Sequence, residues 1–497
     1  MAVVTKEFDY EAALKEATAS SKPFSIKEKI RELKKDSSTK DFYEYLEQLK
    51  KDVRDQNSKE NRYDSLLFKA LIGEKEAVSF FLSAINQYLT RNPFSGTLPA
   101  AYNDAAEAVF HEWIGFGPAY KWFLDKKYTN SPGMQIIGRS IFINEDGKGY
   151  KLYEHKMASF EQVERLKRVL LSNDTYMQVD HHNPAGELKM DDPLWPDKHI
   201  RLAIWIEPRV WNEFITITAR RQVSGYLSFN DQAVTGSIPK EAVPMLKALV
   251  KTYLRTVVAG QVGSGKSTFA NTIVGEQLSM ADRCMGVVMI EKHPESTIPY
   301  VFRDKHRIIP VVAGNDEVTD VGIESLRHDP DIVYLTEMRY YEWGLFLFSS
   351  EKGHKGLIGT YHTDDPEEIP YQGAMAYYSK EGGSLKAHII TASKACELTL
   401  IMRGLPNGQK RLERVSEIIY DPVENSVKSN DLMRWDEETD SWKYNDKVSA
   451  ETLYKMRRVD KQAAEDFMRE LSALAASAGE IKDPVKVSFR AMKELRS

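Results

Sequence analysis

The sequence predicts an α/β protein in which a parallel sheet with intervening helices follows a smaller α+β domain and a helical N-terminal region. Three observations predict this order. Residues 236–425 alternate short apolar runs with helix-like segments, residues 105–235 contain strand-like runs with few helices, and residues 1–104 are charged with apolar residues at helical spacing. At a typical ~150 residues per domain, a chain of 497 residues corresponds to about three domains.

The composition is that of a globular chain. Hydrophobic residues make up 42% and charged residues 28%, which excludes a disordered chain. No apolar run approaches the ~18 residues needed to span a bilayer, and the first residues lack the basic-then-apolar layout of a secretory signal. The 68 basic and 73 acidic residues give a net charge of −5, which argues against a strongly basic nucleic-acid-binding surface.

The cysteine content points to a reducing compartment. The chain has two cysteines, Cys284 and Cys396, which are too few for a disulfide framework or a four-thiolate zinc site. This usage fits the cytosol, so we expect a cytoplasmic protein.

The first 104 residues are expected to be helical. One helix would be capped by Ser25, a second would carry Phe42, Leu46 and Leu49, and a third would cover residues 66–89. Acidic and basic residues are interleaved along these segments, which favours a helical bundle or arm over a nucleic-acid-binding tail.

Short β-branched runs mark the expected strands. In residues 105–235 they indicate an α+β domain with mostly antiparallel strands and a helix at residues 160–171. Residues 426–497 are expected to form a hairpin around residues 431–444 and a charged C-terminal helix. In residues 236–425 the alternation expected of a parallel sheet places strands at residues 256–259, 286–290, 308–312, 332–335, 357–361 and 398–402.

A phosphate-binding loop is the strongest chemical signal. Residues 260–267 read Gly-Gln-Val-Gly-Ser-Gly-Lys-Ser and match G-x-x-x-x-G-K-[ST] in full, between an apolar strand and a helix candidate at residues 269–276. Glycines let backbone N–H groups surround phosphate oxygens, where the helix N-terminus adds positive charge. The lysine would contact the outer phosphates and the serine hydroxyl would ligate Mg²⁺. We therefore expect ATP as the ligand, bound by Gly260, Gly263, Ser264, Gly265, Lys266, Ser267 and Thr268.

Two acidic residues follow later strands of the same sheet. Glu291 and Glu337 each come at the end of an apolar strand, so both are expected at the carboxyl edge, where open α/β folds bind ligands. Glu337 is predicted to hold Mg²⁺ or its water together with Ser267, and Glu291 to polarise the attacking water. His354 and His362 flank another strand, and their spacing leaves open whether they sense the terminal phosphate.

Taken in order, these motifs resemble the type II/type IV secretion ATPase superfamily, the hexameric motors of secretion systems, type IV pili and conjugation machines. Residues 326–331 (Leu-Arg-His-Asp-Pro-Asp) resemble its L-R-x-x-P-D signature, and residues 353–363 resemble its His box. Upstream, residues 115–118 and 199–221 are similar to the N-terminal domain of its tight-adherence and type IV secretion branches. The resemblance covers roughly residues 105–420.

The resemblance implies a RecA-like ATPase core preceded by a small α+β N-terminal domain, assembled as a ring of six. It implies hydrolysis of ATP with Mg²⁺ to power a secretion, pilus-assembly or conjugation machine, whose inner-membrane platform would be the partner. Association with the cytoplasmic face of the membrane would be peripheral, and no direct contact with nucleic acid is expected. By position, the residues that carry over as catalytic or metal-binding are Ser267, Glu291, Glu337 and His362.

The N-terminal domain of the family also implies basic contacts to the nucleotide. Arg220 and Arg221, with Arg201 beside them, are the candidates for phosphate contacts from that domain. Surface arginines at strand ends are an equally good interpretation of the same residues.

The chain departs from the family pattern at three places. Lys292 stands where an aspartate usually follows Glu291, Thr336 replaces the glycine before Glu337, and the His box continues as His-Thr-Asp over residues 362–364. Without a C-x-x-C pair there is no zinc-binding insertion, which favours the tight-adherence, conjugative or archaeal branches. Two other functions stay open: a nucleotide-gated assembly factor with little hydrolysis, and a nucleic-acid-dependent ATPase with the same core.

Overall fold

The computed structural model describes residues 40–57, 63–71, 74–145, 149–172, 177–211, 213–221, 226–292, 295–314 and 317–496. Contacts between residues divide the chain into two compact units, Met1–Val223 and Ser224–Ser497, called the N-terminal and C-terminal units from here on. This division is coarser than the four parts predicted from composition. The helix expected after Ser25 lies outside the described residues.

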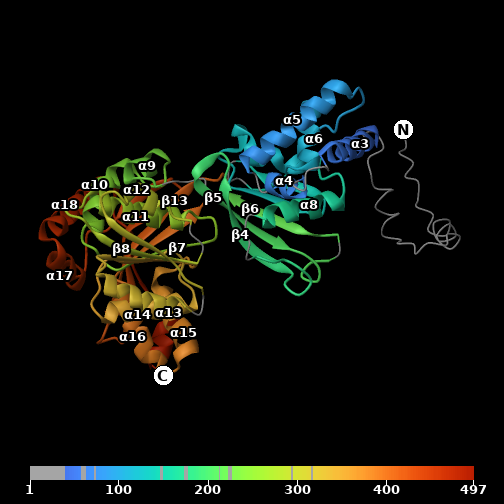
Figure 1. The fold of residues 1–497 in the computed structure, drawn as a ribbon. Coiled ribbons are helices and arrows are strands. Elements are labelled where there is room, and N and C mark those ends of the chain that lie inside the picture. The colour runs from blue at the N-terminus through green and yellow to red at the C-terminus, as the bar shows by residue number, and fades with distance from the viewer. Residues whose placement is uncertain are drawn as a thin grey trace, which may run out of the picture. The chain divides into compact units, whose positions relative to one another are not determined.

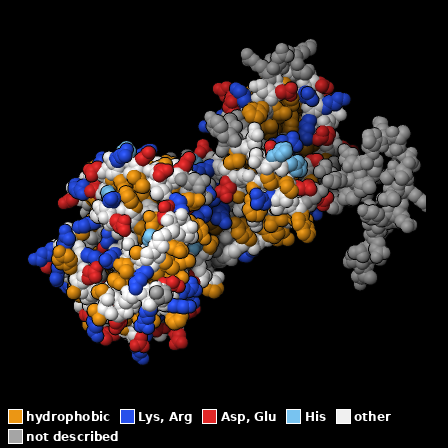
Figure 2. Space-filling model, turned by 90° about the horizontal axis from the view of Figure 1, so that it is seen from below, with side chains coloured by type: hydrophobic (Ala, Val, Ile, Leu, Met, Phe, Trp, Pro, Cys, Tyr) orange, Lys and Arg blue, Asp and Glu red, His pale blue; other side chains and the backbone are white. Residues whose placement is uncertain are grey.

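Two structural findings bear on the predictions about membrane spans and surface charge. Within the described ranges, no helix has the length and apolar character needed to cross a bilayer. On the face seen in Figure 2, acidic and basic side chains are interspersed over the C-terminal unit, as the near-balance of charge along the sequence predicts.

Helices form the first part of the N-terminal unit. Phe42, Leu46 and Leu49 are buried in their shared core, as the spacing predicts. The single helix predicted over residues 66–89 is wrong, because Glu74 has an extended backbone (φ −61°, ψ 121°) and separates two helices. The helices of this part are α3 (Lys40–Asn57), α4 (Tyr63–Leu71), α5 (Lys75–Arg91), α6 (Ala105–Trp113) and the short α7 (Tyr120–Leu124) (Figure 1).

A six-stranded antiparallel sheet completes the N-terminal unit, in the order β3-β2-β1-β6-β5-β4. Helix α8 (Phe160–Leu171) has the predicted bounds, and its Leu166 shares a core with Ile136 and Ile217 of the sheet. The strands are β1 (Gly133–Ile137), β2 (Ser140–Asn144), β3 (Lys151–Lys156), β4 (Ala185–Asp192), β5 (Trp195–Trp205) and β6 (Thr216–Arg221).

A buried ion pair at the end of the interior strand β6 connects the sheet to the segment that precedes it. Successive side chains of β6 point to opposite faces, so Arg220 is exposed and Arg221 is buried. Arg221 Nε donates to Asp192 Oδ2 (2.6 Å), and its other nitrogens donate to the carbonyl oxygens of Tyr128 (2.7 Å) and Trp122 (2.9 Å). The guanidinium also lies 4.1 Å from the centre of the Trp122 ring. Both charged side chains of the pair are fully inaccessible.

The C-terminal unit is built on a ten-stranded sheet with the order β15-β14-β13-β12-β7-β11-β10-β8-β9, and β16 pairs with β14. The strands from β12 to β9 are parallel, as the alternating pattern predicts, and the strands from β12 to β15 are antiparallel. The hairpin predicted around residues 431–444 thus extends this sheet. The strands are β7 (Thr256–Gly260), β8 (Gly286–Glu291), β9 (Arg307–Val312), β10 (Ile332–Leu335), β11 (Leu357–Tyr361), β12 (Leu398–Gly404), β13 (Lys410–Asp421), β14 (Ser426–Asp436), β15 (Ser441–Tyr444) and β16 (Val485–Val487).

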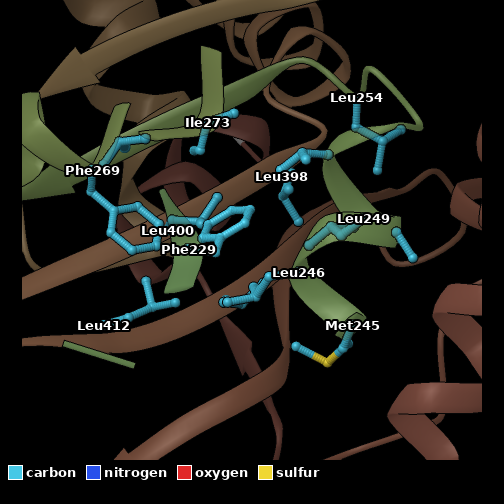
Figure 3. Packing of buried hydrophobic residues seen from close by; sticks show 14 of the residues in the cluster. Phe229, Met245, Leu246, Leu249, Leu254, Phe269, Ile273, Leu398, Leu400 and Leu412 are labelled. Carbon is cyan, nitrogen blue, oxygen red and sulfur yellow. The ribbon is translucent and has the colours of Figure 1, made fainter. Parts of the chain in front are cut away.

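Helices cover both faces of this sheet, and each face has its own apolar core. One core contains Phe229, Leu246 and Phe269 (Figure 3), and the other contains Trp343 and Phe346. The central strand β7 is fully buried and contributes to both cores. The helices are α9 (Phe229–Val234), α10 (Val243–Val250), α11 (Lys266–Ser279), α12 (Ile298–Phe302), α13 (Val318–Ser325), α14 (Tyr340–Glu351), α15 (Ile369–Glu381), α16 (Leu385–Ala395), α17 (Ala450–Val459), α18 (Lys461–Ala478) and α19 (Phe489–Arg496).

The buried ion pair leads to a stability prediction. Arg221→Ala should lower the free energy of unfolding of the N-terminal unit by about 3–5 kcal/mol, because Asp192 would be left as a buried carboxylate without its partner. Urea unfolding followed by tryptophan fluorescence measures this change. Arg220→Ala is the matched control, since the neighbouring side chain is exposed, and it should change the free energy by less than about 0.5 kcal/mol. Equal losses for the two variants would contradict the structural role of Arg221.

Candidate functional site

The phosphate-binding loop joins the central strand β7 to helix α11, as predicted from the sequence. Three of its glycines have positive φ angles: Gly260 (145°), Gly263 (78°) and Gly265 (93°). A Cβ atom on Gly260 would lie 2.2 Å from the carbonyl oxygen of Met402 in β12, so no other residue fits there. The loop therefore has the curled backbone that presents N–H groups to phosphate oxygens.

Polar side chains of the loop have few partners inside the protein. Ser264 Oγ is buried and has no hydrogen-bond partner within the described part of the chain. Lys266 is 7% exposed and its Nζ donates to the carbonyl oxygen of Gln261 at 3.4 Å. Burial lowers the pKa of Lys266, and the charge of Glu337 opposes that shift. Ser267 is exposed on the first turn of α11, where its hydroxyl is accessible to a metal ion. This arrangement is suited to an anion with several oxygen atoms.

Glu337 and His362 lie together next to the loop. His362 Nε2 lies 3.4 Å from Glu337 Oε1, and Arg339 Nη2 lies 3.1 Å from both carboxylate oxygens of Glu337. Burial acts to raise the pKa of Glu337, but the charges and hydrogen bonds of Arg339 and His362 outweigh it and the pKa is lowered. Burial lowers the pKa of His362, and Lys266 lowers it further. The site therefore pairs an ionised carboxylate with a neutral imidazole near pH 7.

Hydrogen bonds between strands hold this acidic turn in place. The amide of Met338 donates to the carbonyl oxygen of Thr360 (2.7 Å), and Thr360 Oγ1 donates to the carbonyl oxygen of Thr336 (2.6 Å). Thr336 Oγ1 donates in turn to the carbonyl oxygen of Ile290 (3.3 Å). Thr336, which replaces the glycine of the family pattern, thus connects β10 to β8 through its side chain.

Glu291 ends β8 as predicted, but its carboxylate supports a local turn. The side chain is buried, and its Oε1 accepts hydrogen bonds from the amides of Glu295 and Ser296, both at 3.2 Å. These contacts account for one carboxylate oxygen. A role for Glu291 as general base stays a prediction.

The two histidines flanking β11 lie at opposite ends of that strand. His354 precedes β11 and its amide bonds to the carbonyl oxygen of Ser349 (3.1 Å), whereas His362 follows the strand beside Glu337. Because the loop and both acids lie at the carboxyl edge of parallel strands, His354 does not belong to the site.

Three side chains near the site were not assigned to it from the sequence. Gln261 Nε2 donates to Asp364 Oδ2 (2.8 Å), which connects the phosphate-binding loop to the residue that departs from the His-box pattern. Arg339 is the second. The third, Lys410, comes from the hairpin between β12 and β13, which follows the phosphate-binding loop by more than a hundred residues. Gln261 lies inside the loop motif and Arg339 directly after the acidic turn, so the positions of these two residues could have indicated site residues.

The three arginines predicted to contact phosphate from the N-terminal domain have different surroundings in the structure. The prediction that Arg221 binds phosphate is wrong, because its guanidinium is fully buried and bonded to Asp192 and to backbone carbonyls. Arg201 lies beside Glu187, with 2.8 Å between Nη2 and Oε2. Arg220 is exposed and remains a prediction.

The donor set of the loop and the acidic turn fits Mg²⁺. Magnesium prefers oxygen ligands and usually combines one or two protein oxygens with phosphate oxygens and water. The accessible hydroxyl of Ser267 and the ionised carboxylate of Glu337 supply such oxygens. In the described residues no cluster of three or more His, Cys, Asp or Glu side chains forms a metal site that is complete without the phosphates.

Comparison with known proteins bears on the family rather than on the individual site residues. Residues 168–372 match the family model described as type II/IV secretion system protein, in agreement with the family that the motifs resemble. The matched residues include the parallel strands β7 to β11, and the C-terminal unit has the α/β architecture predicted for a RecA-like core, preceded by α+β and helical parts.

Two of the similar proteins are named as type IV secretion and conjugal transfer proteins. The chain is 23% identical over 332 residues to type IV secretion system protein VirB11 of Bartonella quintana, covering 58% of this chain and 87% of the relative. It is 29% identical over 144 residues to a putative conjugal transfer protein of Mycobacterium tuberculosis, covering 28% of this chain and 39% of that protein. Among solved structures, the Legionella pneumophila ATPase DotB matches with a TM-score of 0.43 and 15% identity, covering 73% of this chain and 91% of DotB.

The charges around His362 lead to a prediction that tests the geometry of the site. In the metal- and nucleotide-free protein, His362 should titrate below its ordinary pKa of 6.5, because burial and Lys266 disfavour the imidazolium. Lys266→Met should raise its pKa, whereas Glu337→Gln should lower it further, since Glu337 stabilises the charged form. Proton NMR of the histidine ring against pH measures the midpoints. Shifts in the same direction for both variants would contradict the arrangement.

Proposed function

We propose that this chain is an ATP-hydrolysing subunit of a type II/IV secretion-family motor. The observation that carries the proposal is the convergence of three groups at the carboxyl edge of one parallel sheet: the phosphate-binding loop after β7, Glu337 after β10, and His362 after β11. The strands β7, β11 and β10 are adjacent in the sheet, so these groups can act on a single phosphate chain.

Each group has a defined part in hydrolysis. The N–H groups of the loop and Lys266 bind the phosphates and neutralise charge that builds up as the terminal phosphate leaves. Ser267 and Glu337 would hold Mg²⁺, which would supply positive charge to neutralise the phosphate oxygens. Because His362 is neutral near pH 7, it can form a hydrogen bond with the terminal phosphate or the attacking water without repelling Lys266. Glu291 is the candidate for orienting that water.

The motor is proposed to act as a homohexamer at the cytoplasmic face of a membrane. Relatives named as type IV secretion and conjugal transfer proteins favour export or conjugative transfer over pilus assembly, which the family resemblance also implies. The N-terminal region, residues 1–104, is proposed to dock on a cytoplasmic-face component of the inner-membrane platform. Arg220 is proposed as the phosphate contact from the N-terminal domain.

A second candidate is a nucleotide-gated assembly factor that binds ATP and hydrolyses little of it. Two observations favour it: the carboxylate of Glu291 supports a local turn, and Lys292 stands where the family usually has an aspartate. A nucleic-acid-dependent ATPase ranks lower, because no basic stripe with interleaved aromatic residues is found along the sequence. No stimulation of hydrolysis by DNA or RNA is expected.

Phosphate release distinguishes the motor from the assembly factor. Glu337→Gln should reduce the rate of phosphate release from ATP by about 100-fold or more, because the carboxylate acts on the metal and on the transition state. The control is Glu351→Gln at the exposed C-terminal end of α14, which should leave the rate unchanged. The outcome that would establish the assembly factor instead is phosphate release at the background rate by both the natural protein and Glu337→Gln, while ATP still binds.

The oligomeric state is tested by the mass of the particle in solution. Light scattering with and without ATP and Mg²⁺ should give the mass of a hexamer of the 56.8 kDa chain in at least the nucleotide-bound state. A monomer under both conditions would count against a ring.

A further inference from the structure

The hairpin between β12 and β13 brings a lysine to the phosphate-binding loop. Lys410 begins β13 and is paired with Gly404 at the end of β12. β12 lies beside β7, with Met402 opposite Gly260 at the start of the loop. The hairpin therefore flanks the loop on the side away from β11 and β10, which carry His362 and Glu337.

The side chain of Lys410 runs along the loop backbone. A Cβ atom on Gly265 would lie 3.4 Å from Lys410 Cγ and 3.7 Å from its Cδ, so the aliphatic stem packs against the N-terminus of α11. A Cβ atom on Gly404 would lie 3.4 Å from Lys410 Nζ and 3.6 Å from the carbonyl oxygen of Gly263. The amine and the loop therefore border the same small space, which a side chain at position 404 would fill.

Lys410 differs from the neighbouring cations of the hairpin in its charge balance. Arg403 Nη1 lies 3.4 Å from Glu413 Oε1, and Arg411 Nε lies 3.0 Å from Asp440 Oδ1. Over the described ranges, the Lys410 amine has no carboxylate partner. Burial lowers the pKa of Lys410, and no acidic group of the described chain opposes that shift. A half-buried cation without a counter-charge gains most from an anionic ligand.

The two lysines flank the loop from opposite sides. Lys266 interacts with Glu337, on the side of β10, and Lys410 lies on the side of β12. Hydrolysis requires the terminal phosphate to lie next to Glu337 and His362. We propose that Lys410 binds the inner phosphate, the one attached to the nucleoside, of a nucleoside di- or triphosphate. This assignment rests on the proposed function of the loop.

The proposal predicts how affinity changes for different nucleotides. ADP and ATP share the inner phosphate, so loss of the amine should weaken both by the same factor. Loss of a charge-assisted hydrogen bond to a phosphate corresponds to about tenfold to hundredfold in affinity. Lys410→Met keeps the packing of the stem against Gly265, and Lys410→Arg keeps the charge.

Calorimetric titration of the full-length chain with ADP–Mg²⁺ and with ATP–Mg²⁺ tests the proposal. Lys410→Met should weaken both nucleotides at least tenfold and should reduce the dependence of ADP affinity on ionic strength, whereas Lys410→Arg should retain most of the affinity. Lys443→Met, which removes a paired lysine from β15, is the control and should bind as the natural protein does. Thermal unfolding without nucleotide checks the fold of each variant, and Lys410→Gln serves as a second uncharged variant.

The outcomes separate this proposal from the function on which it rests. Unchanged ADP and ATP affinity in Lys410→Met or Lys410→Gln, with Lys266→Ala unable to bind, would overturn the role of Lys410 and leave the proposed function intact. Weaker binding of ATP with unchanged binding of ADP would overturn the assignment to the inner phosphate. Failure of the natural protein to bind either nucleotide would overturn both.

Discussion

The close approach of β12 to the start of the phosphate-binding loop is the contact on which the site depends. At Gly260 a Cβ atom would lie 2.2 Å from the carbonyl oxygen of Met402, so the pairing of β7 with β12 requires glycine there. That pairing places the hairpin bearing Lys410 on one side of the loop. The parallel pairing of β7 with β11, and of β11 with β10, places His362 and Glu337 on the other. The close contact at Gly260 thus fixes the position of the loop, with Lys410 on one side and with His362 and Glu337 on the other.

The site stores unfavourable free energy that an anionic ligand would release. Ser264 Oγ is buried without a partner in the described chain, and burial lowers the pKa of Lys266 and of Lys410. Each such group costs the folded protein stability, because water would solvate it in the unfolded chain. A polyanion that satisfies these groups binds the folded state and stabilises it. By contrast, Glu337 already has Arg339 and His362 beside it, so its charge is balanced within the protein.

The sequence predicted those parts of the molecule that local patterns encode, and missed those that depend on packing across the fold. Apolar runs located the parallel strands, and the loop motif located Lys266, because both are short and continuous. Arg220 and Arg221 cannot be told apart in the sequence. Because side chains alternate along a strand, Arg221 is buried against Asp192 and Arg220 is exposed, and only the pairing of the strands reveals this difference. The break at Glu74 was missed because the apolar spacing continues across it. Lys410 reaches the loop through a hairpin that begins more than a hundred residues later, which no local spacing records.

The pairing of β14 with β16 has a consequence for how the C-terminal unit is made. Lys428 pairs with Val487, and Thr256 of the central strand pairs with Leu398, so the sheet joins segments that are far apart along the chain. Sheets with such distant pairings form late and fold slowly. The chain loses the conformational entropy of long loops before the stabilising contacts between the strands can form. During synthesis the phosphate-binding loop therefore leaves the ribosome long before the strands that support it. The N-terminal unit has all of its strands, β1 to β6, by residue 221. It can therefore fold before the last strands of the C-terminal unit have been synthesised.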